Sequence, residues 1–105
     1  MNSIEDTIRI NALYDYYKEL LTEKQKDYFE AFYFENMSLS EIADNYNVSR
    51  NAVYSQLNLT VDAINKYESK LHLYENDIKR EEIFNKLKEL DDKRINDLVS
   101  KLEEI

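Results

Sequence analysis

Apolar residues recur every three or four positions along most of the chain, the spacing of one face of an α-helix. The first such run follows Ser3, a residue type that caps helices, and a second follows Thr22 and ends near Asn36. The pattern predicts two amphipathic helices. Their expected inward positions are Ile10, Leu13, Tyr14, Tyr17, Leu20, Leu21, Tyr28, Phe29, Phe32 and Tyr33.

Three further capping signals divide the chain. Thr22 is followed three residues later by Gln25, and Ser38 by Glu41, which is the spacing of a capping box. Ser49 precedes another helical run. We therefore expect a short helix after Ser38, with inward Ile42, Ala43 and Tyr46, and a longer helix after Ser49. The expected inward residues of the longer helix are Val53, Leu57, Val61, Ile64, Tyr67 and Leu71.

The segment from residue 38 to residue 57 has the organisation of a helix-turn-helix. A short helix, a turn of three to four residues and a second capped helix follow each other directly. Asn47 lies in the turn, and asparagine tolerates the left-handed backbone better than other residues with a side chain. Ala43 is small where two steeply crossing helices come closest. We place the helix-turn-helix within residues 22–72.

The first turns of the helix after Ser49 contain the candidate nucleic-acid contacts. A helix-turn-helix presents this end of its second helix to the major groove, where Arg reads guanine and Asn reads adenine through paired hydrogen bonds. The same polar residues also suit a solvated helix face. The candidates are Ser49, Arg50, Asn51, Tyr54, Ser55 and Asn58.

The last third of the chain is highly charged and has an apolar stripe. It predicts one long C-terminal helix over about residues 75–105. A five-residue step from Leu90 to Ile95 interrupts a strict heptad repeat, so we favour a packed helix over a long coiled coil. An apolar stripe of this length must pack against another surface, and we expect a second copy of the chain to provide it, in a homodimer. The candidate interface residues are Ile83, Leu87, Leu90, Ile95, Leu98 and Leu102.

Composition limits the fold to the all-α class. The 105 residues contain no Gly, no Pro and no Cys. Glycine-dependent hairpin turns, phosphate-binding loops and disulfides are therefore excluded. We expect one helical domain spanning residues 1–105, a helical bundle with the helix-turn-helix and the long C-terminal helix as its parts.

The same inventory argues against an enzyme. His72 is the only histidine, and no Cys or second His is available to form a metal site with it. We expect no cofactor, no bound metal, no small-molecule ligand and no membrane span, and a cytoplasmic location. The aromatic side chains could form a base-stacking platform, but their helical spacing and the lack of interleaved basic residues favour core packing. The aromatic set is Tyr14, Tyr16, Tyr17, Tyr28, Phe29, Phe32, Tyr33 and Phe34.

Charge weakens the case for DNA binding. The formal net charge is −8, from 14 basic and 22 acidic residues. Between Ser49 and Ile64 the only cation is Arg50, which Asp62 offsets. Affinity for a duplex grows with the number of phosphates that Lys and Arg neutralise, so a single Arg contributes little.

Several short segments carry a family resemblance. They are LYDYY at residues 13–17, LLTEKQ at 20–25, SLSEIA at 38–43, SRNAVY at 49–54 and YESKLHLYE at 67–75. Through them the chain resembles the YlxM family of helix-turn-helix proteins over about residues 8–90. The part from residue 21 to residue 53 also resembles region 4 of bacterial sigma factors. The resemblance implies an all-α protein associated with the signal recognition particle pathway. Basic residues expected along the recognition helix are missing here.

Two hypotheses follow. The first is a non-enzymatic regulatory or accessory protein that docks on a protein or an RNA of the signal recognition particle. The second is a DNA-binding transcriptional regulator that places the helix at residues 49–72 in the major groove. Fold does not decide between them, but the missing cations favour the first.

Overall fold

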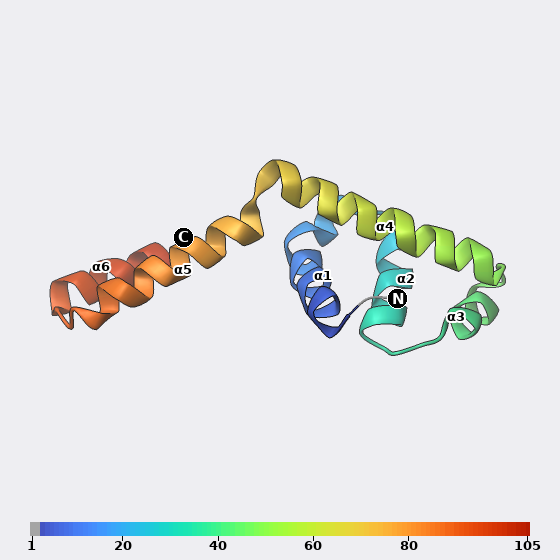
Figure 1. Ribbon diagram of the computed structural model, residues 1–105, viewed down its shortest axis with the longest axis horizontal. Helices are drawn as coiled ribbons and strands as arrows, with labels where there is room; N and C mark the ends of the chain where they lie inside the picture. Colours follow the sequence, from blue (N-terminus) through green and yellow to red (C-terminus); the bar gives the residue numbers. More distant parts are fainter. Residues whose placement is uncertain (1–2) are drawn as a thin grey trace. The chain divides into compact units, whose positions relative to one another are not determined.

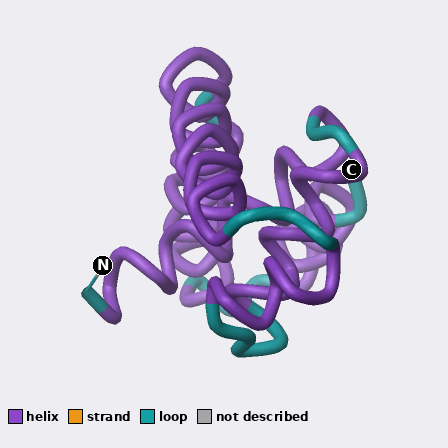
Figure 2. Tube along the Cα trace, turned by 90° about the vertical axis from the view of Figure 1, so that its right-hand side faces the viewer, coloured by secondary structure: helices purple, strands orange, loops and turns teal. Residues whose placement is uncertain are grey.

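The computed structural model describes residues 3–105, and this part of the chain is helical, without strands (Figure 2). The all-α prediction is therefore confirmed. Figure 1 shows the helices in chain order. They are α1 (Ile4–Tyr17), the short 3-10 helix η1 (Lys18–Leu20), α2 (Glu23–Tyr33), α3 (Leu39–Tyr46), α4 (Arg50–Leu71), α5 (Leu73–Glu89) and α6 (Lys93–Glu103).

The helices form two compact units. The N-terminal unit ends at His72 and contains α1 to α4, and the C-terminal unit begins at Leu73 and contains α5 and α6. In the N-terminal unit α4 contacts each of the other three helices. It is therefore the element on which that unit is assembled.

The predicted caps begin the helices of the N-terminal unit. The Ser3 hydroxyl accepts a hydrogen bond from the Asp6 amide at 3.1 Å. Thr22 begins α2 and Ser38 begins α3, each with both hydrogen bonds of a capping box, and Ser49 begins α4. These side chains satisfy amide groups that a helix leaves unpaired in its first turn. Local chemistry therefore sets where these helices begin.

Aromatic side chains form much of the core between α1 and α2. The rings of Tyr14 and Phe29 stack with their centroids 4.3 Å apart, and Phe29 stacks on Tyr33 at 4.5 Å. Tyr14, Tyr17 and Phe29 are all buried, as is Tyr28. The interpretation of the aromatic set as core is confirmed for these residues. Tyr16 and Phe34 of the same set are exposed.

Three side chains predicted to face inward are exposed instead. Leu20 is 53% exposed because it lies in η1, whose tighter 3-10 turn ends the α-helical register of the buried face of α1. Tyr46 is 44% exposed at the last turn of α3, although its ring edge still contacts Tyr28. Leu71 is also exposed, at the end of α4.

Two tyrosine–carboxylate pairs connect the helices of the N-terminal unit. The buried Tyr17 hydroxyl donates to the buried carboxylate of Glu68, and the Tyr14 hydroxyl donates to Glu30. A guanidinium nitrogen of Arg9 donates to the Asn65 side chain at 2.9 Å. Buried polar groups require such partners, so the bond between Tyr17 and Glu68 favours one arrangement of α1 against α4.

Because of the Tyr14–Glu30 pair, we expect the stability of the fold to fall at alkaline pH. Burial raises the pKa of the Tyr14 phenol above its ordinary value of 10.0, and the Glu30 carboxylate raises it further. The neutral phenol is thus favoured in the folded state. Its contribution to stability is complete below pH 10 and is lost as pH rises toward the higher folded-state pKa. We expect the free energy of unfolding to fall between about pH 10 and pH 11.5 in urea titrations, and to fall less in Tyr14→Phe. An equal slope in both proteins would contradict this assignment.

The C-terminal unit corrects the prediction of a single helix over residues 75–105. The chain turns at residues 90–92, where Asp91 has the left-handed backbone angle φ = 50°. The Asp92 carboxylate accepts hydrogen bonds from the amides of Arg94 and Ile95 and so begins α6. The turn falls at the five-residue step that interrupts the apolar repeat. Two contacting helices result, with Phe84 and Val99 buried.

Candidate helix-turn-helix interface

The turn between α3 and α4 has a left-handed residue where the sequence predicts one. Asn47 ends α3 with φ = 55° and ψ = 45°. Its amide donates to the Ala43 carbonyl, and the Val48 amide donates to the same carbonyl at 3.1 Å. Asparagine adopts this conformation at lower cost than most side chains, so the turn can form without glycine. The chain then enters α4 directly through Ser49.

A shared apolar core holds α3 against α4. Ile42 and Val53 are completely buried, and Ala43 and Leu57 are 5% and 2% exposed. Tyr28, Ala31 and Leu39 complete this core cluster, against which Phe32, Met37 and Val48 pack. Because α2 and both helices of the motif contribute, the exposed end of α4 is held on a rigid support.

The six predicted contact residues all lie exposed at the beginning of α4. The hydroxyl of Ser49 accepts from the Ala52 amide at 3.0 Å, so this side chain serves as the helix cap. Arg50 and Asn51 occupy the first turn. Helical spacing places Asn51, Ser55 and Asn58 on one face, with Tyr54 beside them. The structure thus brings the candidate residues together on one surface, which we call the α4 face: Ser49, Arg50, Asn51, Tyr54, Ser55 and Asn58.

The electrostatics near the α4 face are acidic rather than basic. Arg50 forms no ion pair within residues 3–105. Glu41 and Asp44 are exposed on the neighbouring α3. The Ser38 backbone and side chain bond to Glu41 and lower the pKa of its carboxyl, which keeps it anionic at neutral pH. A phosphate backbone laid across both helices would meet more negative than positive charge.

Next to the α4 face lies one apolar side chain, Leu59, that the sequence analysis did not single out, and we include it in the α4 face from here on. Leu59 is 58% exposed, one helical turn beyond Ser55, and Tyr54 is 42% exposed. The signal for Leu59 was available, because it breaks the three-to-four spacing of Val53, Leu57, Val61 and Ile64. Five residues separate Tyr54 from Leu59, so the two exposed side chains flank the polar row of Asn51, Ser55 and Asn58 on opposite sides, and aromatic and apolar side chains within a polar surface suit protein contact.

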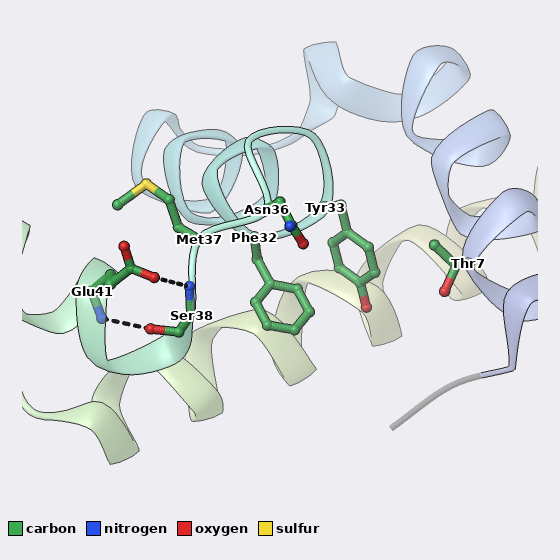
Figure 3. Close-up of a pocket in the computed structure, with 7 residues that line it drawn as sticks. All are labelled: Thr7, Phe32, Tyr33, Asn36, Met37, Ser38 and Glu41. Carbon is green, nitrogen blue, oxygen red and sulfur yellow. Dashed lines mark hydrogen bonds between the residues drawn. The ribbon is translucent and has the colours of Figure 1, made fainter.

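A hollow of about 430 Å³ lies on another side of the motif (Figure 3). Its lining comes from α1, the end of α2, the following loop and α3: Thr7, Phe32, Tyr33, Asn36, Met37, Ser38 and Glu41. The two polar groups of its α3 end bond to each other, since Ser38 and Glu41 form the capping box drawn as dashed lines (Figure 3). These groups therefore serve the helix rather than a ligand.

The remaining candidate chemistry has a structural explanation. His72 ends α4 in the left-handed conformation with φ = 55°, and its amide donates to the Glu68 carbonyl at 2.9 Å. Across residues 3–105, no three His, Asp or Glu side chains are grouped to hold a metal ion. In that same part, no helix combines the length and apolar character needed to cross a membrane.

The motif formed by α3, the Asn47 turn and α4 defines a helix-turn-helix protein. The family model described as "Putative helix-turn-helix protein, YlxM / p13 like" matches residues 4–105, and the chain belongs to this family, UPF0122. It is 50% identical over 88 residues to a UPF0122 protein of Staphylococcus epidermidis, covering 84% of this chain and 80% of the relative. It is 44% identical over 108 residues to the UPF0122 protein YlxM of Bacillus subtilis, covering 98% of each. The Geobacillus relative is 41% identical over 108 residues, 97% of this chain and 98% of its own length.

Proposed function

We propose that this protein is a non-enzymatic accessory or regulatory protein that uses the α4 face to bind a protein of the signal recognition particle pathway. The observation that carries the proposal is the composition of that face. One cation, Arg50, accompanies neutral polar residues and the exposed apolar side chains of Tyr54 and Leu59. Tyr and Arg are the residue types that most often dominate protein–protein binding energy.

The charge of the chain supports a protein partner over a nucleic acid. A net charge of −8 repels a polyanion and attracts a basic protein surface, which speeds the encounter. Proteins of the signal recognition particle bind RNA and so generally present basic surfaces. The resemblance to the YlxM family implies an association with this pathway, and we therefore propose one of its proteins as the partner.

DNA binding is the second candidate function, and a specific observation favours it. Arg50 and Asn51 lie exposed in the first turn of a capped helix that follows a helix-turn-helix turn. These are the positions and residue types that read base edges in the major groove. A dimer would be required to supply enough phosphate contacts.

Binding to the purified GTPase of the particle tests the first function. We expect Tyr54→Ala with Leu59→Ala to raise Kd at least about tenfold, because both side chains would lose buried contact area. Leu20→Ala is the matched control, since Leu20 is 53% exposed on η1, outside the α4 face. It should leave Kd unchanged. Fluorescence anisotropy of the labelled chain at 0.15 M salt, about physiological, measures both.

The same assay with labelled duplex DNA separates the two functions. The first predicts no binding to duplex fragments selected from genomic DNA. Saturable duplex binding that is lost in Arg50→Ala with Asn51→Ala would establish the regulator instead. If neither the Tyr54–Leu59 variant nor the Arg50–Asn51 variant changes the Kd for the GTPase, the α4 face is not the binding surface.

A further inference from the structure

The helical hairpin of the C-terminal unit buries very little of its apolar surface. Its buried hydrophobic residues are Phe84 and Val99. Five aliphatic side chains remain more than half exposed: Ile83 at 58%, Leu90 at 63%, Leu98 at 61%, Leu102 at 51% and Ile105 at 102%. A two-helix unit of this size lacks the core that an isolated fold needs. The exposed leucines and Ile83 are the surface that would complete it.

The exposed leucines and Ile83 lie on one side of the hairpin. On α5, the exposed Ile83 lies four residues before the half-buried Leu87 and on the same helical face, and the exposed Leu90 follows directly after α5 ends at Glu89. On α6, Leu98 and Leu102 are four residues apart. Ile83 precedes the buried Phe84, and Leu98 precedes the buried Val99, each by one residue. Because α5 and α6 run in opposite directions and face each other through Phe84 and Val99, both stripes turn to the same side. We call this side the hairpin face.

The charge along the hairpin changes sign from one end to the other. Residues 83–96, around the turn, contain four basic and three acidic side chains. Residues 73–82 and 97–105, at the open end, contain three basic and seven acidic ones. Some pair within the hairpin, as Lys88 does with Glu103 at 3.1 Å. Within residues 3–105, the charges outside these ion pairs are two lysines and two acidic residues at the turn end, and one lysine and four acidic residues at the open end. They are Lys86, Lys93, Glu89 and Asp91 at the turn end, and Lys101, Glu81, Glu82, Asp97 and Glu104 at the open end. They remain available to another chain.

We infer that the hairpin face binds the hairpin face of a second copy of this chain, in an antiparallel four-helix bundle. An antiparallel two-fold arrangement lays the turn end of each hairpin on the acidic open end of the other, and both copies gain the same complementary contacts. A parallel arrangement would oppose the two acidic ends. Four helices around the combined leucines give each hairpin the core that it lacks alone.

The mass of the full chain in solution tests this inference. We expect sedimentation equilibrium at chain concentrations of about 5–200 μM to yield twice the 12.6 kDa mass of one chain. Leu98→Glu with Leu102→Glu should raise the dimer Kd at least about tenfold, since charges would enter the apolar contact. Ile8→Glu is the matched control, because Ile8 is 63% exposed on α1 and belongs to neither the hairpin face nor the α4 face, and it should leave Kd unchanged.

Two additional measurements keep the test decisive. Circular dichroism checks that the variants remain helical. If the glutamate variant loses its helicity, Leu90→Ser replaces it, because Leu90 lies just after α5 and outside both helices. A wild-type monomer over the whole range, or a variant dimer with unchanged Kd, would overturn the inference.

The orientation can be read by energy transfer, since the chain contains no native cysteine. Chains labelled at Lys93→Cys near the turn are mixed with chains labelled at Glu104→Cys near the open end. Antiparallel packing predicts stronger transfer in this mixture than between two Lys93→Cys labels. The reverse order would exclude the antiparallel arrangement.

Discussion

Replacing Phe29 by alanine is expected to destabilise the N-terminal unit by about 3–5 kcal/mol, the range measured for large-to-small changes of buried aromatic residues. Phe29 is completely buried. Its ring stacks on Tyr14 at 4.3 Å and on Tyr33 at 4.5 Å, so truncation opens a cavity between α1 and α2. Small domains are stable by only about 5–15 kcal/mol, so the loss would be a large fraction of the total.

Phe34→Ala is the matched control for this prediction. Phe34 has the same side chain and touches the same ring cluster edge-on, but half of it is exposed. Its truncation should cost about 1 kcal/mol. Urea unfolding followed by circular dichroism measures both variants. Similar losses for the two phenylalanines would mean that the ring stack is not the centre of this core.

Enlarging Ala43 to leucine is expected to destabilise the helix-turn-helix by about 1–3 kcal/mol, because the site has no room for three more carbons. Ala43 is 5% exposed and belongs to the cluster that holds α3 against Val53 and Leu57. A larger side chain would push α3 away from α4 and strain the Asn47 turn, whose amides bond to the Ala43 carbonyl. Binding at the α4 face should weaken with it, although Ala43 touches no partner.

Ala52→Leu offers the same substitution at an exposed position of α4. It adds the same volume without entering the core, and thermal unfolding should change little, by about 0.5 kcal/mol or less. Equal destabilisation by the two variants would indicate that leucine disturbs the helix itself. If neither variant destabilises the protein, α3 and α4 are not tightly packed around Ala43.

The same motif serves both candidate functions, and side-chain chemistry separates them. The helix-turn-helix fixes the position of the α4 face through buried residues such as Ile42 and Val53. In our proposal, the exposed residues Arg50, Tyr54 and Leu59 select the partner that this face binds. The two candidate functions therefore differ in the roles they give to exposed side chains and not in the fold, which can present many different surfaces.

The beginnings of the helices could be predicted because their causes are local. A hydroxyl at Thr22 and a side-chain acceptor at Gln25 lie three residues apart, and a first helical turn brings them together whatever the rest of the chain does. The left-handed Asn47 was predictable for the same reason, since backbone sterics at one residue select it. The all-α class followed from the absence of glycine and proline together with helical spacing.

The C-terminal hairpin could not be predicted with the same ease. The residues of 75–105 continue a helical spacing, and the five-residue step from Leu90 to Ile95 was interpreted as a departure from a coiled coil. It is instead the turn between α5 and α6, with Asp92 as a cap. The signal was present in Asp91 and Asp92, but a helix can also continue through two aspartates at modest cost.

The sequence by itself determined the all-α character, the caps of α1 to α4, the helix-turn-helix and the acidic character of the chain, because each depends on neighbours in the chain or on composition. Only the tertiary structure decided which apolar residues are core. It buries Phe84 and Val99 and leaves Leu59, Leu98 and Leu102 exposed, although all five are apolar residues in helical runs. Helical periodicity gives each residue a direction around its own helix, but the element that packs there comes from a distant part of the chain. Burial is therefore a property of the assembled helices.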